Sequence, residues 1–386
     1  MKERIEYLDN LRIAMVVFTV AFHTIRTYAV WWWYPVDVPE TSAVLTPYIS
    51  IFLAFGMNMF LLLSGYFTPV SYNRKGLKNF HIARIKRLLV PLVIFAAIMP
   101  FLLYTEFVKN VEYQSVGFRE YFIQYFLGFG GKPENWHNPI WPDFNYGHLW
   151  FLEYLLIFGV FYSLIRKIRD RNGLQDKGEK KSFPRFHIIL LFITALSLVT
   201  FIVRIWFRMS EWTFFFLVIQ ITFAHTPQYC AFFIVGILAY RNDWLHQIPE
   251  RTGWINVVIA VGAMIFISIL NTIIPLGSSV LQTGFTLESF IYSIWECVLA
   301  TSMAISLPFL FKKFVNHQNK ALKKISKYTY LIYIFHVPVI LFIQIAFVNI
   351  RLHPIMLSFI VTLLALVICF ILSFLVRLIP YAKKNF

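Results

Sequence analysis

The sequence predicts an all-α, polytopic integral membrane protein with about ten transmembrane helices and both termini in the cytoplasm. Three observations lead to this prediction. Hydrophobic residues make up 59% of the 386 residues, and charged residues only 14%. The apolar runs are long enough to cross a bilayer. The basic residues fall in short clusters between these runs, as the positive-inside rule expects.

The apolar runs define ten predicted spans and leave little chain between them. They lie at about 9–31, 47–69, 88–108, 148–166, 186–207, 226–241, 254–273, 287–310, 328–348 and 354–379. The sixth span is the least clearly bounded, because the apolar stretch 211–230 also suits an outer re-entrant or interfacial piece. We interpret residues 5–380 as a single membrane-embedded domain and 381–386 as a short basic cytoplasmic tail.

The distribution of charge sets the predicted orientation. If the N-terminus is cytoplasmic, the inner segments are 1–12, 70–87, 166–185, 241–251, 311–327 and 377–386. These segments hold 28 of the 35 Lys and Arg residues, which puts both termini inside. The net charge of +16 is therefore explained by topology, and no nucleic-acid partner is expected.

The first span, Asp9–Thr27, carries ionisable residues at membrane depth, which is costly unless they face a protein interior or an aqueous cavity. Arg12 and His23 are eleven residues apart. At about 100° per residue they project from one helical face, roughly 16 Å apart along the axis. This face suits a functional site, but a basic flank plus one hydrogen-bonded buried histidine would give the same pattern.

Polar residues in two further segments each have two possible roles. Asn58 lies in the middle of the second span and suits either interhelical hydrogen bonding or a pocket. Arg84 and Arg87 lie three residues apart just before the third span. They form an ordinary basic flank or a pair that binds a phosphate-bearing ligand.

Later spans add more ionisable groups. His148, Trp150 and Glu153 lie at the outer end of the fourth span, where tryptophan is typical of the membrane interface and also suits sugar stacking. Glu296 lies deep in the eighth span and His336 near the middle of the ninth. Buried histidines and carboxylates on several helices are more than passive packing requires. The sequence offers no cysteine or histidine spacing typical of a metal site, and we expect none.

Several motifs together resemble the integral-membrane acyltransferase family 3, including its glucan biosynthesis protein C branch. The hallmark of that family is an arginine followed after ten residues by a histidine in the first helix, and Arg12 and His23 fit it. The resemblance runs from about residue 5 to 380. Its motifs are LDNLRIAMVVFTVAFH, MNMFLLLSGYFT, HIARIKRLLVP, GHLWFLEYLL, YCAFFIVGILAY, SIWE and YLIYIFHVPV.

The resemblance implies an O-acyltransferase of the cell membrane. The expected donor substrate is cytoplasmic acyl-CoA, either acetyl-CoA or succinyl-CoA, with no bound cofactor. The expected acceptor is a hydroxyl group of an extracytoplasmic carbohydrate or lipid-linked glycan, and membrane lipid surrounds the protein.

The resemblance also implies roles for the singled-out residues. Neutral His23 acts as a general base or carries the acyl group, and Glu153 or Glu296 orients it. The CoA phosphates contact Arg12, Arg84 and Arg87. Asn58, His148, Trp150 and His336 are further pocket candidates.

A transporter or exporter of polysaccharide or lipid-linked sugar is the alternative, because ten helices with ionisable groups at the midplane also suit transport. A receptor or scaffold without turnover is a third possibility. No inverted repeat or pair of broken helices supports the transporter. A His23 variant separates the classes, because only an acyltransferase should lose acyl transfer.

Overall fold

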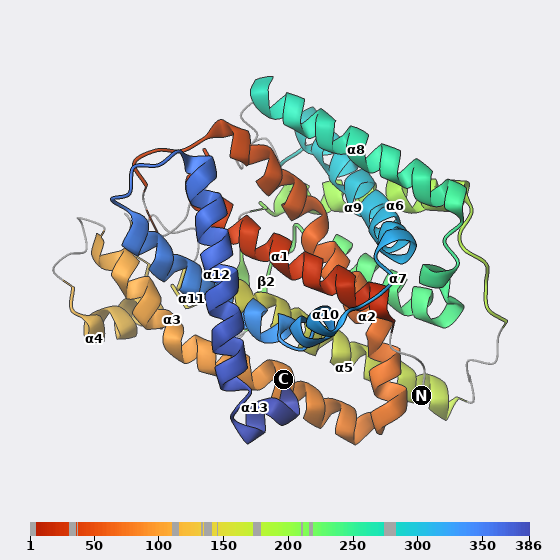
Figure 1. Ribbon diagram of the computed structural model, residues 1–386, viewed down its shortest axis with the longest axis horizontal. Coiled ribbons are helices and arrows are strands. Elements are labelled where there is room, and N and C mark those ends of the chain that lie inside the picture. Colours follow the sequence, from red (N-terminus) through yellow and green to blue (C-terminus); the bar gives the residue numbers. More distant parts are fainter. Residues whose placement is uncertain are drawn as a thin grey trace. The chain divides into compact units, whose positions relative to one another are not determined.

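The computed structural model describes residues 5–30, 36, 38–109, 116–132, 134, 141–144, 146–172, 179–209, 211–215, 219–273 and 283–386. These residues are almost entirely helical (Figure 1). They divide into two compact units. The first comprises Met1–Arg74, Gln175–Arg208 and His225–Phe386, and the second comprises Lys75–Leu174 and Met209–Ala224.

The first unit is a bundle of long helices. Its elements are α1 (Glu6–Tyr28), the first part of α2 (Thr46–Arg84), α6 (Phe186–Trp206), α7 (Thr226–Asn242), α8 (Glu250–Ile273), α9 (Leu287–Phe314), α10 (Lys320–Ile325), α11 (Thr329–Phe347), α12 (Pro354–Val376) and α13 (Pro380–Asn385). Helix α9 is lined on most sides by other helices, and many of its buried residues are small. Serine, alanine and threonine let neighbouring backbones approach closely, as is typical of helices packed within membranes.

The second unit contains the end of α2 and most of the remaining elements. They are a π-helical turn (Ile85–Leu89), α3 (Val90–Lys109), α4 (Phe118–Glu120), a second π-helical turn (Tyr121–Phe126), α5 (Trp150–Arg171), β1 (Thr213–Phe215) and β2 (Ile219–Ile221). Strands β1 and β2 pair antiparallel, with Phe214 opposite Gln220. This pair lies where the sequence suggested a re-entrant or interfacial piece. Its aromatic and β-branched residues favour strand pairing.

Helix α1 packs against α9, α11 and α12 and is held near both ends. Near its start, Asn10 donates to the backbone oxygens of Val315 and His317 at 2.8 and 3.1 Å. Near its end, Thr27 donates to the buried Gln344 of α11 at 3.1 Å. These bonds fix the rotation of α1, and therefore the face on which Arg12 and His23 lie.

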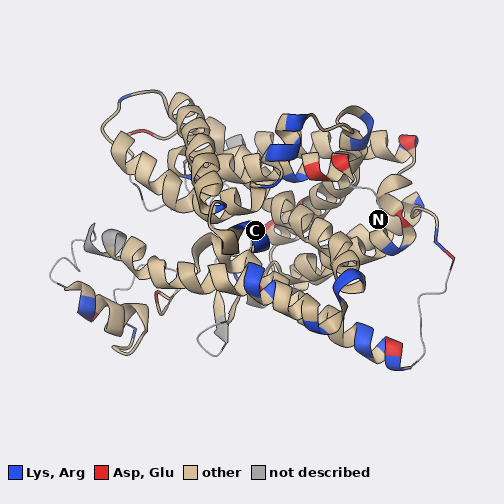
Figure 2. Ribbon diagram, turned by 60° about the horizontal axis from the view of Figure 1, so that its bottom comes forward, with Lys and Arg blue, Asp and Glu red and all other residues tan. Residues whose placement is uncertain are grey.

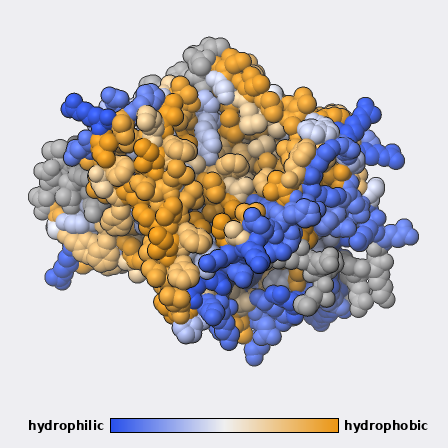
Figure 3. Space-filling view, in the orientation of Figure 1, coloured by the Kyte–Doolittle hydropathy of each residue, from blue (hydrophilic) through white to orange (hydrophobic). Residues whose placement is uncertain are grey.

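The helices have the surface of membrane spans. Eight segments of the described residues are long and apolar enough to cross a bilayer. Each of the ten predicted spans coincides with a helix, whereas their number of crossings and the cytoplasmic location of the termini stay predictions. Lys and Arg gather near helix ends and leave the middles of the long helices apolar (Figure 2). The outward face of α12 is hydrophobic (Figure 3), with residues such as Phe359, Leu363 and Val367 exposed.

Residues 70–87, expected as a loop between the second and third predicted spans, are helical instead, and their inner location stays a prediction. The structure continues α2 to Arg84, interrupted only at Gly76, whose φ is 70° and ψ 170°. Positive φ favours glycine, so this residue bends the helix without ending it. The lysine and arginine residues of this segment favour a loop outside the membrane, because charged side chains are unfavourable in the bilayer core. Both residue types are also good helix formers.

Helices α2 and α7 cross at two glycines. A Cβ added at Gly65 would overlap the backbone oxygen of Phe233, and one added at Gly236 would overlap that of Leu62. The two backbones can approach this closely only without side chains at the crossing.

We expect Gly65→Ala to destabilise the protein by about 1–3 kcal/mol, because the added methyl must push two backbones apart. The matched control is Gly262→Ala on α8, where an added Cβ has no neighbour within 4 Å. That change should be neutral or stabilise by up to about 1 kcal/mol. Thermal unfolding in nanodiscs compares them, and equal melting temperatures would contradict the tight crossing.

Candidate active site

The Arg12 and His23 side chains lie on one face of α1, as their spacing predicts. Arg12 forms an ion pair with Asp9 at 3.2 Å, and its guanidinium carbon lies 3.9 Å from the centroid of the Phe67 ring. The Arg12 side chain is 37% exposed. A guanidinium stacked on an aromatic ring has a fixed plane, and its outward edge can bind an anion bidentately.

His23 lies against a second imidazole, that of His336 on α11. Their ring centroids are 4.9 Å apart, with planes inclined at 61°. His336 is fully buried, and its Nδ1 lies 2.6 Å from the backbone oxygen of Tyr333. A carbonyl accepts only, so Nδ1 carries the proton, and Nε2 of the neutral ring keeps its lone pair. The structure thus brings together two histidines that are 313 positions apart in the sequence.

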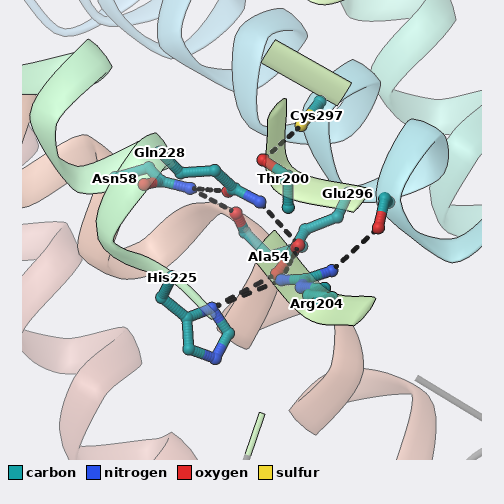
Figure 4. Close-up of polar contacts among 9 residues, drawn as sticks. Ala54, Asn58, Thr200, Arg204, His225, Gln228, Glu296 and Cys297 are labelled. Carbon is teal, nitrogen blue, oxygen red and sulfur yellow. Dashed lines mark hydrogen bonds and ion pairs between the residues drawn. The ribbon is translucent and has the colours of Figure 1, made fainter. Parts of the chain in front are cut away.

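Glu296 lies in a buried polar cluster (Figure 4). Its Oε2 accepts hydrogen bonds from Arg204 of α6 at 2.5 Å and from Gln228 of α7 at 2.6 Å. Asn58 of α2 in turn donates to the Gln228 side chain at 2.7 Å. Three helices therefore meet at one carboxylate, and α2 joins them through Gln228. Among the described residues, the partners of Glu296 do not include His23, so an orienting role toward His23 stays a prediction.

The sequence reasoning missed three members of this cluster: Arg204, Gln228 and His225. Arg204 was taken for an outer positive charge, but it lies within α6 and is fully buried. The available signal was its position in the apolar run FIVRIW, because an arginine there requires a partner. Gln228 and His225 gave no signal, because one polar residue near a helix start is common.

Glu153 lies in the second unit with His148 and Trp150. Its Oε1 accepts a hydrogen bond from the backbone N–H of Gln220 in β2 at 2.9 Å. Trp150 packs edge-on against Trp212, with ring centroids 5.4 Å apart, and His148 packs against Phe95 in the same way. The strand pair therefore positions the Glu153 carboxylate. Trp141 is described, whereas Trp136 lies outside the described residues.

Arg84 and Arg87 differ in environment. Arg84 is turned against α5, where its Nη1 donates to the backbone oxygen of Leu155 at 2.6 Å. Arg87 lies in the π-helical turn and is exposed. A Cβ added at Gly159 would come within 2.8 Å of Arg84 Nε, so this glycine makes room for the guanidinium. Wider π-helical turns occur frequently at functional sites.

The comparisons assign the chain to a family. The profile of acyltransferase family 3, described as an acyltransferase domain, matches residues 5–374. The chain belongs to this family. It is similar to proteins named glucans biosynthesis protein C, and its long apolar helices suit a multi-pass membrane protein. No solved structure matches it.

The relatives of this family member include proteins named glucans biosynthesis protein C. The one from Escherichia coli O157:H7 is 29% identical over 252 residues, which cover 62% of this chain and 58% of the relative. That from strain K12 is 28% identical over the same length. The match to the O139:H28 protein extends over 266 residues at 28% identity. The chain thus spans about three fifths of these relatives.

The arrangement suits acyl transfer to a hydroxyl group. A neutral imidazole takes a proton from an attacking hydroxyl, and nearby cations bind a phosphorylated donor. The described residues hold no cluster of three or more His, Cys, Asp or Glu side chains arranged to bind a metal.

A buried carboxyl precedes α5. Asp143 is 3% exposed and accepts a hydrogen bond from the Tyr121 hydroxyl at 2.6 Å. Burial raises the pKa of Asp143 from 3.8 to about 6, although the Tyr121 hydrogen bond acts in the opposite direction. The fold therefore favours the neutral acid.

This raised pKa predicts a pH dependence. The stabilisation by neutral Asp143 is complete below pH 3.8 and is lost as the pH rises through about 6. It amounts to about 3 kcal/mol. Asp143→Asn stays neutral, so its melting temperature should rise relative to wild type between pH 4.5 and 7.5. The exposed Glu120, changed to Gln, is the control and should show no such trend. Parallel pH profiles for wild type and Asp143→Asn would contradict the burial effect.

Proposed function

We propose that the protein transfers an acetyl or succinyl group from cytoplasmic acyl-CoA to a hydroxyl group of an extracytoplasmic glycan or lipid-linked acceptor in the cell membrane. The observation that supports this most is the placement of Arg12 and His23 on one face of α1, with His336 beside His23, in a chain of an acyltransferase family. Membership in this family favours acyl transfer over the transport alternative.

The proposed chemistry needs one base and a way to bind the donor. His23 takes the proton of the acceptor hydroxyl while its oxygen attacks the thioester carbonyl. The carbon–sulfur bond then breaks, and the CoA thiolate receives the proton from His23. The products are an ester and free CoA. If His23 instead attacks first, the same groups transfer through an acyl-histidine.

His336 is the proposed positioning residue for His23. Its Nδ1 is held by the Tyr333 carbonyl, which fixes the ring plane against His23.

The basic residues proposed to contact the CoA phosphates are described unit by unit. In the first unit the residue is Arg12, whose guanidinium plane is fixed by Phe67. In the second unit the residues are Arg84 and Arg87. Guanidinium groups bind phosphate oxygens through paired charge-assisted hydrogen bonds, which suits the diphosphate and 3′-phosphate of CoA.

We expect His23→Ala to lower the rate of acyl transfer by about 10²–10⁴-fold, because the base is removed. Purified protein in nanodiscs is incubated with radiolabelled acetyl-CoA or succinyl-CoA and a glucan oligosaccharide, and labelled oligosaccharide is counted. His187→Ala is the control, because His187 is exposed at the start of α6. Equal transfer by wild type and His23→Ala would refute the proposed role.

Gly159→Ala tests Arg84 without changing a charge. The added methyl must displace the guanidinium from Leu155, so we expect the KM for acyl-CoA to rise by about three- to tenfold at little change in kcat. Gly117→Ala is the control in the same unit, since an added Cβ there meets nothing within 4 Å. An unchanged KM would place the donor phosphates away from Arg84.

A further inference from the structure

The hydrogen bonds around Glu296 run in one direction (Figure 4). Asn58 Nδ2 donates to the backbone oxygen of Ala54 and to Gln228 Oε1. Gln228 Nε2 donates to Glu296 Oε2, which also accepts from Arg204. The nitrogen of each side-chain amide faces hydrogen-bond acceptors. Exchanging the nitrogen and oxygen of either amide would therefore lose hydrogen bonds.

With the hydrogen bonds arranged in this direction, two side-chain oxygens of the cluster accept none from the described residues. Glu296 Oε1 and Asn58 Oδ1 are buried and accept no hydrogen bond from any residue in the described part of the chain. The residues themselves are 0% and 2% exposed. A buried acceptor without a donor is costly and rare in folded proteins. Two of them in one cluster, on side chains joined through Gln228, are available to accept hydrogen bonds from the hydroxyl groups of a ligand.

The cluster has an accessible edge at His225. The His225 side chain is 13% exposed, against 0% for Arg204 and 1% for Glu296, and its Nδ1 lies 3.8 Å from Glu296 Oε1. That distance is too long for a hydrogen bond. The His225 ring stacks on Tyr229, with centroids 5.8 Å apart and planes inclined at 16°. Tyr229 itself is buried, so the edge consists of the partly exposed His225 ring beside Glu296 Oε1.

We propose that this cluster is a hydroxyl-binding subsite for a carbohydrate acceptor. Glu296 Oε1 and Asn58 Oδ1 accept hydrogen bonds from sugar hydroxyl groups, and the His225 ring, backed by Tyr229, contacts the sugar at the edge. Carboxylate and amide oxygens beside aromatic rings suit a polyhydroxylated ring with apolar faces. The proposal rests on the proposed function, because it names the substrate class that receives the acyl group.

The first test is Glu296→Gln. Because Oε2 accepts two hydrogen bonds, the new amide oxygen stays there and its nitrogen takes the place of Oε1. The vacant acceptor becomes a donor at unchanged shape. We expect binding of a radiolabelled glucan oligosaccharide in nanodiscs to weaken by about ten- to a hundredfold, and the acceptor KM to rise equally.

Glu296→Gln leaves Arg204 without its counter-ion, so a second variant guards against misfolding. Arg204→Leu combined with Glu296→Met replaces the ion pair with apolar side chains, an exchange that folded proteins often tolerate. This double variant should fold and yet lose oligosaccharide binding. If the ion pair serves only structure, the double variant will bind the oligosaccharide as wild type does, and the proposal is overturned.

Asn58 has a matched control in Asn256. Both are buried, and each donates from Nδ2 to the carbonyl four residues earlier. Asn58→Leu should weaken oligosaccharide binding by about tenfold, whereas Asn256→Leu should not change it. Equal binding by the two variants would show that the Asn58 oxygen takes no part.

Two readouts separate this proposal from the proposed function. If wild type consumes acyl-CoA but does not bind the oligosaccharide, the subsite is refuted and the donor reaction stands. If wild type binds the oligosaccharide through Glu296 but consumes neither acetyl-CoA nor succinyl-CoA, the subsite stands and the acyltransferase proposal falls. If water alone fills the cluster, every variant that folds will bind the oligosaccharide as wild type does, which also refutes the subsite.

Discussion

The first unit depends on the ion pair between Arg204 and Glu296. Both side chains are buried, and their nitrogen and oxygen lie 2.5 Å apart. An unpaired charge at such a place would cost several kcal/mol, so α6 and α9 must stay in register. Gln228 and Asn58 extend this requirement to α7 and α2, whose glycine crossing brings them close enough to connect. Polar contacts thus determine which helices are neighbours in a bundle where apolar surface alone does not discriminate.

Helix α1 meets a different constraint. It is held near its ends by neutral amides, Asn10 at one end and Gln344 at the other, and by the ion pair of Glu6 with Lys323. Arg12 and His23 are not part of these contacts. Arg12 keeps partial exposure beside Phe67, and His23 faces His336. Structural and reactive polar groups are therefore separated along one helix. Such a division allows a base to change protonation state without loosening the packing that positions it.

Local patterns in the sequence were sufficient for the helices and for one face of α1. Hydrophobic runs located a helix at each of ten predicted spans, and a spacing of eleven residues placed Arg12 with His23. They failed where structure depends on distant partners. Arg204 resembled a flanking charge because its carboxylate lies 92 positions later. The basic residues after 70 suggested a loop, although the chain is helical there. Residues 213–215 and 219–221 form a strand pair, which periodicity cannot distinguish from a short apolar helix.

The buried cluster also shows that acceptors with and without hydrogen-bond donors support different interpretations. An ion pair with every acceptor filled would be explained by stability alone, and apolar residues often stabilise as well. Here the donors of Arg204 and Gln228 converge on a single oxygen of Glu296. Sharing the donors between both oxygens would satisfy more acceptors in the same space. The observed arrangement instead keeps one oxygen vacant beside the exposed edge at His225. A carbohydrate hydroxyl group bound there, as proposed above, would supply the donor that this oxygen accepts from and would offset the cost.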